Sequence, residues 1–296
     1  MTKKTFRSLI YVKEEKMNCD LHTHTVHSDG SLTPTELVRE AKERNLIIAL
    51  TDHNTVSGLP EFMVEAQRQG VTAVGGTELS CIYGGREFHL IGLFIEPEHY
   101  DEVEKLCTDY HALKEKSNID LIDKLCAMGY DLDYREIQKE NVNGRINRAH
   151  IATELTKKGY VSSVPEAFAS LLDEKCGIYT PPKRLSLADG IRFLRSIKAV
   201  PLLAHPLKEI DAKSLREMLP EMIEAGLVGM ETMHSSYDEE KIAVSREIAA
   251  EFGLIESGGS DFHGRFKPGV FLGVGKGNLS IDEQVYCNFL EAKNRL

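Results

Sequence analysis

Short apolar runs of strand length alternate along this chain with segments that have the periodicity of helices. Runs such as 46–51 (LIIALT) and 199–204 (AVPLLA) are apolar at nearly every position, which is typical of strands buried on both faces. Helical segments follow them, and the one after the first strand opens with the capping box Thr33-Pro34-Thr35-Glu36. This alternation predicts an α/β fold in which helices cover a parallel sheet.

The alternation is interrupted between residues 97 and 182, where the pattern is helical throughout. Helices are expected at 97–128, 133–140, 147–159 and 164–174, and two prolines at 181 and 182 close the block. We therefore expect a helical insertion at 97–182 within a catalytic domain formed by 17–96 and 183–296. Residues 1–16 are expected to be a flexible N-terminal extension or the product of an upstream start.

The composition limits the class of protein. With 42% hydrophobic and 28% charged residues the chain is typical of globular proteins. No apolar run reaches the roughly 18 residues of a membrane span, and residues 9–12 are too short a core for a signal peptide, so we expect a cytoplasmic protein with no membrane partner. The net charge of −10 argues against binding long nucleic acids but permits a small phosphorylated substrate.

Histidines and carboxylates gather at the ends of the expected strands. In DLHTHTVHSDG, His22 and His24 stand two residues apart on an extended segment, so both rings point to the same face. Any one such histidine is more often a core or loop residue than a ligand. Because the carboxyl ends of parallel strands meet at one edge, we expect these side chains to converge. The candidate metal ligands are His22, His24, Asp29, His53, Glu78, His89, His205, Asp261 and His263.

Nine candidate ligands exceed the roughly three protein ligands of a single catalytic zinc ion. They predict two or three divalent ions that share at least one carboxylate. A nitrogen and oxygen set without thiolates favours manganese, with zinc or iron as alternatives. The adjoining Asp20 and Asp52 are expected to orient histidines by accepting hydrogen bonds. The glycine pairs 75–76 and 258–259 are expected to permit close approach of the backbone rather than to cradle phosphate.

Six motifs, HTHTVHSDG, TDHNT, GTELS, REFHLIG, LLAHP and GGSDFHG, resemble in order those of the PHP (polymerase and histidinol phosphatase) superfamily. The resemblance implies a distorted seven-stranded (β/α) barrel with a helical insertion and a trinuclear metal site. It also implies how the ligands divide among the ions: His22, His24, Glu78 and Asp261 for one, Glu78, His89 and His205 for a second, and Asp29, His53 and His263 for a third. No ligand is missing, which disfavours a degenerate, inactive module.

Two further stretches, NGRINRAHIATELTKKGYV in the insertion and METMHSS before the last strand, resemble the TrpH/YciV-like subgroup. Its members are nucleoside 3′,5′-bisphosphate phosphatases and 5′→3′ exoribonucleases. The resemblance implies phosphate binding by Arg145, Arg148 and His150, although arginines at a helix start are as often surface residues.

Three residues near the expected ligands complete the candidate site. His234 is the candidate catalytic residue, in contact with the leaving group or a phosphate, with a loop hydrogen bond as the alternative. Arg265, a candidate substrate-binding residue, and Lys267 follow the last metal motif and would add positive charge, with plain solvent exposure as the alternative.

The predicted function is that of a metal-dependent phosphoesterase. Metal-bound hydroxide would release phosphate from a small phosphorylated substrate, for example a nucleoside 3′,5′-bisphosphate. We recognise no serine or cysteine nucleophile with a paired base, so no covalent phosphoenzyme is expected. Three alternatives stay open: a 5′→3′ exoribonuclease acting on short RNA, a histidinol phosphatase, and a metal-binding module without catalytic activity.

Overall fold

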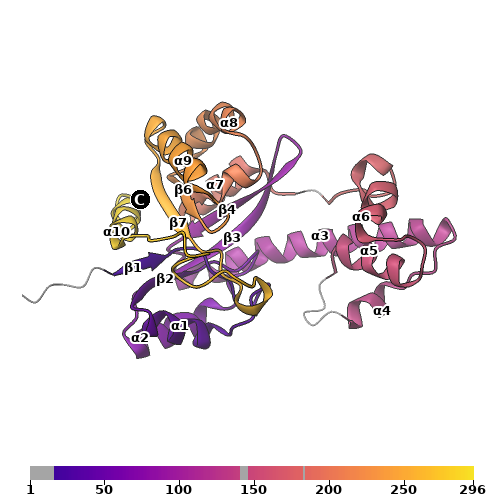
Figure 1. Ribbon diagram of the computed structural model, residues 1–296, viewed down its shortest axis with the longest axis horizontal. Coiled ribbons are helices and arrows are strands. Elements are labelled where there is room, and N and C mark those ends of the chain that lie inside the picture. The colour runs from indigo at the N-terminus through magenta and orange to yellow at the C-terminus, as the bar shows by residue number, and fades with distance from the viewer. Residues whose placement is uncertain (1–16, 141–145, 183) are drawn as a thin grey trace, which may run out of the picture.

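Seven strands form one sheet in chain order in the computed structural model, which describes residues 17–140, 146–182 and 184–296 (Figure 1). Six strands run in one direction, and the fourth runs in the opposite direction. The strands are β1 (Asn18–Asp20), β2 (Leu46–Leu50), β3 (Ala73–Tyr83), β4 (Arg86–Leu93), β5 (Val200–Leu203), β6 (Gly229–His234) and β7 (Ile255–Gly259).

The sheet curls into a nearly closed barrel because β7 returns to β1. The Leu21 N–H donates to the Gly258 carbonyl at 3.2 Å, and Thr23 and Phe262 form a parallel bridge just past the ends of the two strands. The seven-stranded α/β barrel expected from the sequence is therefore confirmed. Its interior holds apolar side chains such as Ile47, Leu93 and Leu202.

The expectation of a wholly parallel sheet is wrong at β4, which pairs antiparallel with both β3 and β5. Only Gly84 and Gly85 connect β3 to β4, and their φ values are 56° and 77°. Two residues with positive φ make a tight hairpin turn, whereas a parallel connection needs a crossover of a dozen residues or more. As a result β3 continues to Tyr83, and Glu78 lies within this strand rather than at its end.

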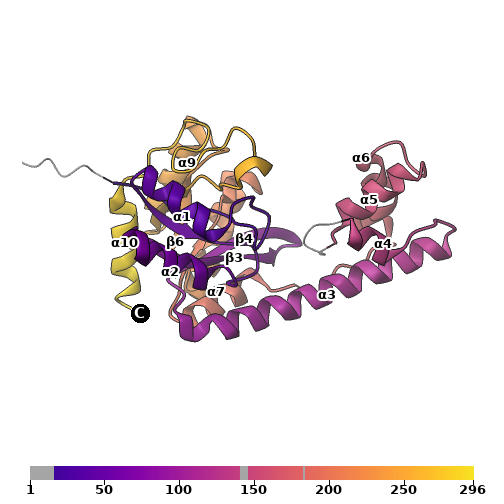
Figure 2. The same cartoon turned by 90° about the horizontal axis from the view of Figure 1, so that it is seen from below.

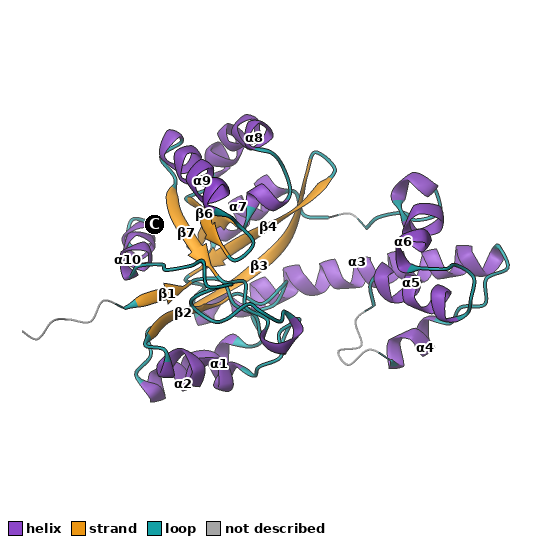
Figure 3. Ribbon diagram, viewed as in Figure 1, coloured by secondary structure: helices purple, strands orange, loops and turns teal. Residues whose placement is uncertain are grey.

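Helices cover the outside of the barrel and one of its ends (Figure 3). Five pack around its wall: α1 (Pro34–Glu43), α2 (Leu59–Gln69), α7 (Leu187–Ser196), α8 (Ala212–Ala225) and α9 (Glu239–Glu251). Helix α10 (Glu283–Lys293) was not expected, and it covers the end at which β1 and β6 begin. Its Phe289 is fully buried in the interior core beside Gly229. The opposite end of the barrel is left to the loops that follow the parallel strands.

The insertion is built on one long helix, α3 (Tyr100–Ala127), which runs from the barrel to a separate cluster of helices (Figures 1 and 2). Near its start Val103 packs in the apolar layer between the barrel wall and the outer helices. Near its end Leu125 packs with Ile151 and Leu155. The cluster consists of α4 (Tyr134–Lys139), α5 (Arg148–Lys157) and α6 (Val164–Ala167). Among the described helices, none has the length and apolar character needed to cross a membrane.

Candidate metal centre

The nine candidate ligands come together at the open end of the barrel, where the parallel strands finish. Strand β4 begins at this same end, which brings its His89 to the site from the opposite direction. The contributing segments are the loop after β1 (His22, His24 and Asp29), the loop after β2 (His53), the hairpin strands (Glu78 and His89), and the loops after β5 (His205) and β7 (Asp261 and His263).

Glu78 lies at the middle of this group, with its side chain fully buried. Its two carboxylate oxygens contact five imidazoles: Oε2 lies 3.0 Å from His22 Nε2, 3.3 Å from His24 Nε2 and 3.1 Å from His53 Nδ1, and Oε1 lies 2.8 Å from His89 Nδ1 and 3.2 Å from His205 Nε2. Burial raises the pKa of this carboxyl, but the surrounding histidines hold the pKa well below its usual value. The carboxylate is therefore ionised and available to cations on several sides.

Asp261 provides a second buried carboxylate. Its Oδ1 lies 3.3 Å from His24 Nε2 and 3.7 Å from His22 Nε2, while Oδ2 lies 3.2 Å from His234 Nε2 and also contacts Lys267 Nζ. The backbone of Asp261 has φ 55°, a conformation that non-glycine residues adopt rarely and mainly at functional sites.

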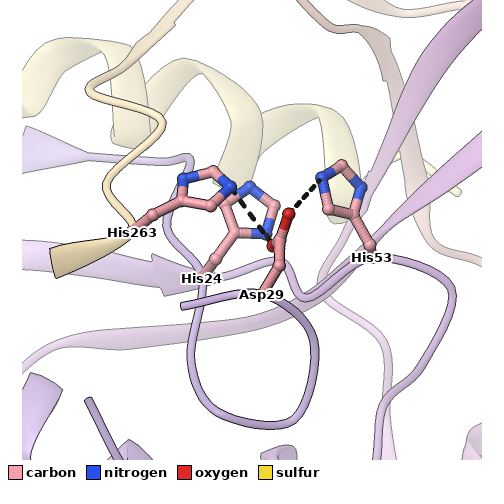
Figure 4. A group of neighbouring side chains, drawn as sticks. All are labelled: His24, Asp29, His53 and His263. Atoms are coloured by element: carbon pink, nitrogen blue, oxygen red, sulfur yellow. Dashed lines mark ion pairs between the residues drawn. The ribbon is translucent and has the colours of Figure 1, made fainter. Parts of the chain in front are cut away.

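Asp29, His24, His53 and His263 form a third group, nearer to solvent (Figure 4). Asp29 Oδ1 lies 3.2 Å from His263 Nε2 and 3.8 Å from His24 Nδ1, and Oδ2 lies 3.8 Å from His53 Nε2. The Asp29 side chain is 57% exposed, so this group is at the mouth of the site.

The donor atoms fit divalent cations. Five buried ring or carboxylate atoms make no contact with hydrogen-bond geometry among the described residues, although several lie within 3.3 Å of an oppositely charged group: His22 Nε2, both ring nitrogens of His24, Glu78 Oε2 and His205 Nδ1. Buried polar atoms are normally paired, so this concentration of unpaired atoms indicates a site shaped for another group. All nine candidates fall within four sets whose ligand atoms lie within 4.8 Å of one another: His24-Asp29-His53-His263, His22-Glu78-His205, His22-His24-Asp261 and His53-Glu78-His89.

These sets differ in detail from the division that the family resemblance implied. His24 belongs to the set that contains Asp29 and also to the set that contains Asp261, and His22 shares a set with His205. The assignment of particular ligands to particular ions stays a prediction.

Glu231 is a residue of this region that the sequence reasoning missed. It is fully buried on β6, with Oε1 2.9 Å from His22 Nδ1, and its Oε2 accepts a hydrogen bond of 2.7 Å from the His205 backbone N–H. The available indication was a glutamate on a buried strand whose two neighbours, β5 and β7, both lead into predicted ligands.

The sequence predicted that Asp20 and Asp52 orient histidines by accepting hydrogen bonds, and Asp20 does accept one from the backbone N–H of His22, at 3.4 Å. Asp20 also accepts from the backbone N–H groups of Ser260 and Gly273. Asp52 accepts from the backbone N–H of Thr25 at 2.7 Å. Both carboxylates therefore hold the backbone of the loops that carry the candidate ligands.

Two adjoining cavities open beside the ligands. One, of about 270 Å³, is lined by Ser28, Asp29, His53, Asn54, Ser80, Glu87, His89 and Lys114. The other, of about 200 Å³, lies between the barrel and the insertion and shares Glu87 and Lys114 with the first. Arg148, a candidate substrate ligand, lines the second cavity, together with Tyr110, Tyr179 and Arg184.

The remaining candidates are placed differently. His150 caps α5, since its Nδ1 accepts a hydrogen bond from the Asn147 backbone N–H at 3.1 Å, and it lines neither of these two cavities. Arg265 is exposed, with its guanidinium 5.1 Å from the Phe266 ring. The buried His234 ring contacts Ser236 Oγ at 2.8 Å as well as Asp261. Arg145 lies outside the described residues. The roles predicted for these four stay predictions.

Comparison with known proteins finds relatives and solved structures that are similar to most of this chain. The model of the PHP domain matches residues 20–173. A 5′-3′ exoribonuclease of Haemophilus influenzae is 31% identical over 90% of this chain and 96% of its own. A phosphoribosyl 1,2-cyclic phosphate 1,2-diphosphodiesterase of Eggerthella lenta is 30% identical over 83% of this chain and 94% of its own.

The third relative is a 3′,5′-nucleoside bisphosphate phosphatase of Chromobacterium violaceum, which is 30% identical over 83% of this chain and 87% of its own. A solved structure from Bifidobacterium adolescentis, described as a metal-dependent phosphoesterase, superposes with a TM-score of 0.71 at 26% identity. That match covers 93% of this chain and 97% of the other.

Proposed function

This chain belongs to the PHP domain family, and we propose that it removes one phosphate from a small nucleotide that carries two, such as a nucleoside 3′,5′-bisphosphate. Its relatives are phosphoesterases, and the chain is a metal-dependent phosphoric ester hydrolase. The observation that carries the narrower proposal is the second cavity, which is lined by cationic and aromatic side chains together with Glu87. Through Glu87 and Lys114 it adjoins the first cavity, where the candidate ligands lie.

The nine clustered side chains would hold two or three divalent ions, with manganese the metal we favour. When bound, such ions hold the oxygens of a phosphate and lower the pKa of coordinated water. The protein's own part is to fix the ligands and their charge. Glu78 keeps its negative charge among the imidazoles, and the contacts of His234 and Lys267 with Asp261 hold that carboxylate in place.

The second cavity supplies groups suited to the rest of a nucleotide. The Arg148 guanidinium lies 4.2 Å from the centre of the Tyr179 ring and 5.7 Å from that of Phe168. Among the described residues its one hydrogen bond runs from Nη1 to the Leu172 carbonyl, at 3.0 Å. Rings hold the guanidinium by its faces and leave donors at its edge for a phosphate, the anion that its planar fork fits best.

The aromatic walls of this cavity add a surface for a base. Aromatic side chains can stack with any of the nucleobases. The rings of Tyr110, Phe168 and Tyr179 line this cavity. Lys114 lines both cavities and would face the bound nucleotide from α3. A substrate with a phosphate at each end would then span from the ligand cluster to Arg148.

A 5′→3′ exoribonuclease acting on short RNA is the second candidate, favoured by the similarity to the Haemophilus influenzae enzyme. A short oligomer would place its first nucleotide in the same two cavities. The net charge of −10 disfavours longer chains, whose affinity depends on many cationic contacts to phosphates.

The test compares four substrates with manganese-loaded protein: adenosine 3′,5′-bisphosphate, a 5′-phosphorylated RNA trimer, phosphoribosyl 1,2-cyclic phosphate and histidinol phosphate. We expect the highest kcat/KM for phosphate release from the bisphosphate. Asp261→Ala and His53→Ala variants serve as controls and should be inactive. A higher kcat/KM for any of the other three substrates would refute the proposal, and equal inactivity of all proteins would refute catalysis altogether.

A further inference from the structure

Glu231 is a buried carboxylate that belongs to none of the four sets of clustered ligands. It nevertheless contacts two candidate ligands, His22 and His205. Its Oε1 lies 2.9 Å from His22 Nδ1, and its Oε2 accepts a 2.7 Å hydrogen bond from the His205 backbone N–H. The side chain is 1% exposed. A carboxylate at this depth is costly unless both oxygens are paired, and here both are.

The regular alternation of β6 turns Glu231 toward the inside of the barrel. Gly229, two residues earlier and on the same face, lies beside the interior Phe289, whereas Met230 packs with the outer helices. Glu231 still pairs in register with Ser257 of β7, and the register shifts only after it, before Met233.

The two contacts of Glu231 act on different parts of the two histidines. At His22 the carboxylate takes the Nδ1 side of the ring, which leaves Nε2 facing Glu78 Oε2 at 3.0 Å. At His205 it holds the backbone, whose φ of 28° lies in the left-handed region. The rings of these histidines are stacked, with centroids 5.7 Å apart and planes inclined by 14°.

We propose that Glu231 is a positioning residue that fixes the ring of His22 and the backbone of His205 for cation binding. By accepting from Nδ1–H it keeps the proton on that nitrogen and leaves Nε2 as the ligand atom. By accepting from the His205 N–H it holds that residue in an unfavourable backbone conformation. One carboxylate thus aligns ligands from two strands. The inference rests on the proposed metal dependence of the site but not on the identity of the substrate.

The experiment measures manganese affinity by calorimetry for wild type, Glu231→Ala and Glu231→Gln. Loss of an outer partner of a metal ligand typically weakens metal affinity by about 10–100-fold, and we expect a loss in this range for Glu231→Ala. The amide of Glu231→Gln can accept from only one of the two N–H groups, so its affinity should be intermediate. The control is Glu256→Gln on the neighbouring strand β7, where Glu256 pairs with the exposed Arg246 and touches none of the candidate ligands.

A second readout reports on the ring itself. In zinc-loaded protein, nitrogen NMR of the histidine rings should show His22 protonated at Nδ1 in wild type and in Glu256→Gln, with this resonance lost or shifted in both Glu231 variants. A purely structural role would lower thermal stability without moving this resonance. If Glu231→Ala does not fold, the folded Glu231→Gln variant decides.

Wild-type manganese affinity together with an unchanged His22 resonance in a folded Glu231 variant would overturn the inference. Its failure is distinguishable from failure of the proposed function. If manganese binds with the expected dependence on Glu231 but no bisphosphate is hydrolysed, the substrate proposal is wrong and the positioning role is supported.

Discussion

His89 Nδ1 lies 2.8 Å from Glu78 Oε1 across the antiparallel pair of β3 and β4. In this ladder Glu78 is opposite Ile91 and His89 is opposite Ser80, so the two side chains are diagonal neighbours on one face. The hairpin alone therefore places a carboxylate and an imidazole in contact, without any other strand. The loops after β1, β2 and β5 then add imidazoles to the same carboxylate.

Replacing Glu78 by glutamine should abolish cation binding rather than weaken it. Glutamine keeps the size of the side chain but removes the charge that faces five imidazoles. We expect manganese affinity and kcat/KM to fall by more than the roughly 100-fold that outer partners of a metal site can cost. Metal analysis and steady-state kinetics check this.

The matched control for this change is Glu65→Gln, which alters a buried glutamate on α2 that pairs with Arg68 away from the site. Its metal content should equal that of wild type. Full manganese loading of Glu78→Gln would show that the negative charge of Glu78 is not required for cation binding.

Much of the fold could be predicted because local pattern determines it. The apolar runs at β2 and β5 read directly as buried strands, and the capping box at Thr33 begins α1 as expected. The convergence of seven of the nine candidate ligands also followed from simple geometry, since residues that follow parallel strands meet at one end of a barrel. Glu78 and His89 instead reach this end within the antiparallel hairpin.

What could not be predicted depends on contacts between distant segments. The antiparallel direction of β4 is an exception, because its turn, Gly84-Gly85 between two strand-like runs, is a local hairpin signal that the interpretation of the sequence overlooked. Asp20 was expected to orient a histidine, and besides the His22 backbone N–H it accepts from the Gly273 N–H, far along the chain. Glu231 was passed over because nothing in its neighbourhood along the chain shows that β6 lies next to His22 and His205.

Manganese binding should release protons, and its affinity should rise with pH. Burial lowers the pKa of His24, but its contacts with Asp261 and Glu78 outweigh burial and raise the pKa to about 9. For His89, burial also lowers the pKa, but contact with Glu78 outweighs it and raises the pKa to about 10. A raised pKa means that these rings carry a proton at neutral pH in the metal-free protein, and a cation must displace it. The affinity gain should continue until the pH passes these values.

Calorimetric titrations at about pH 6.5 and about pH 8.5, in buffers with different heats of ionisation, measure both effects. His99→Gln provides a control, because His99 faces Glu102 on the surface of the insertion and not the site. Equal affinity at both pH values, with no proton release, would show that His24 and His89 do not bind the metal.

Replacing Arg148 by alanine should act on the second phosphate alone. A hydrogen bond to a charged group contributes about 1.5–3 kcal/mol, so the KM for adenosine 3′,5′-bisphosphate should rise by roughly 10–100-fold. The KM for a simple aryl phosphate, which has no second phosphate, should stay unchanged. Arg148→Lys keeps the charge but not the planar contact with Tyr179, and should be intermediate.

The control for Arg148 is Arg192→Ala, an exposed arginine on α7 that pairs with Asp189. Neither substrate should be affected by it. An equal rise in KM for the bisphosphate and the aryl phosphate in Arg148→Ala would place Arg148 at the reacting phosphate instead of the second one.

Replacing Gly259 by alanine should disturb His22 through direct contact. A Cβ at this position would lie 2.2 Å from His22 Cβ and 2.7 Å from the His22 backbone nitrogen, so the backbones of β1 and β7 must separate. Overpacking of this kind costs about 1–3 kcal/mol, and the free energy of unfolding in urea should fall by that amount in metal-free protein. Gly75→Ala is the control, because the nearest atom to its Cβ would be Leu59 Cδ1 at 3.3 Å, a side-chain atom that can move, and the Ile95 carbonyl oxygen would lie at 3.4 Å, an ordinary contact. Manganese affinity should fall in Gly259→Ala and stay unchanged in Gly75→Ala, since His22, a candidate metal ligand, lies beside the shifted strand. Equal stability of the two variants would mean that the close approach at Gly259 does not hold His22 in place.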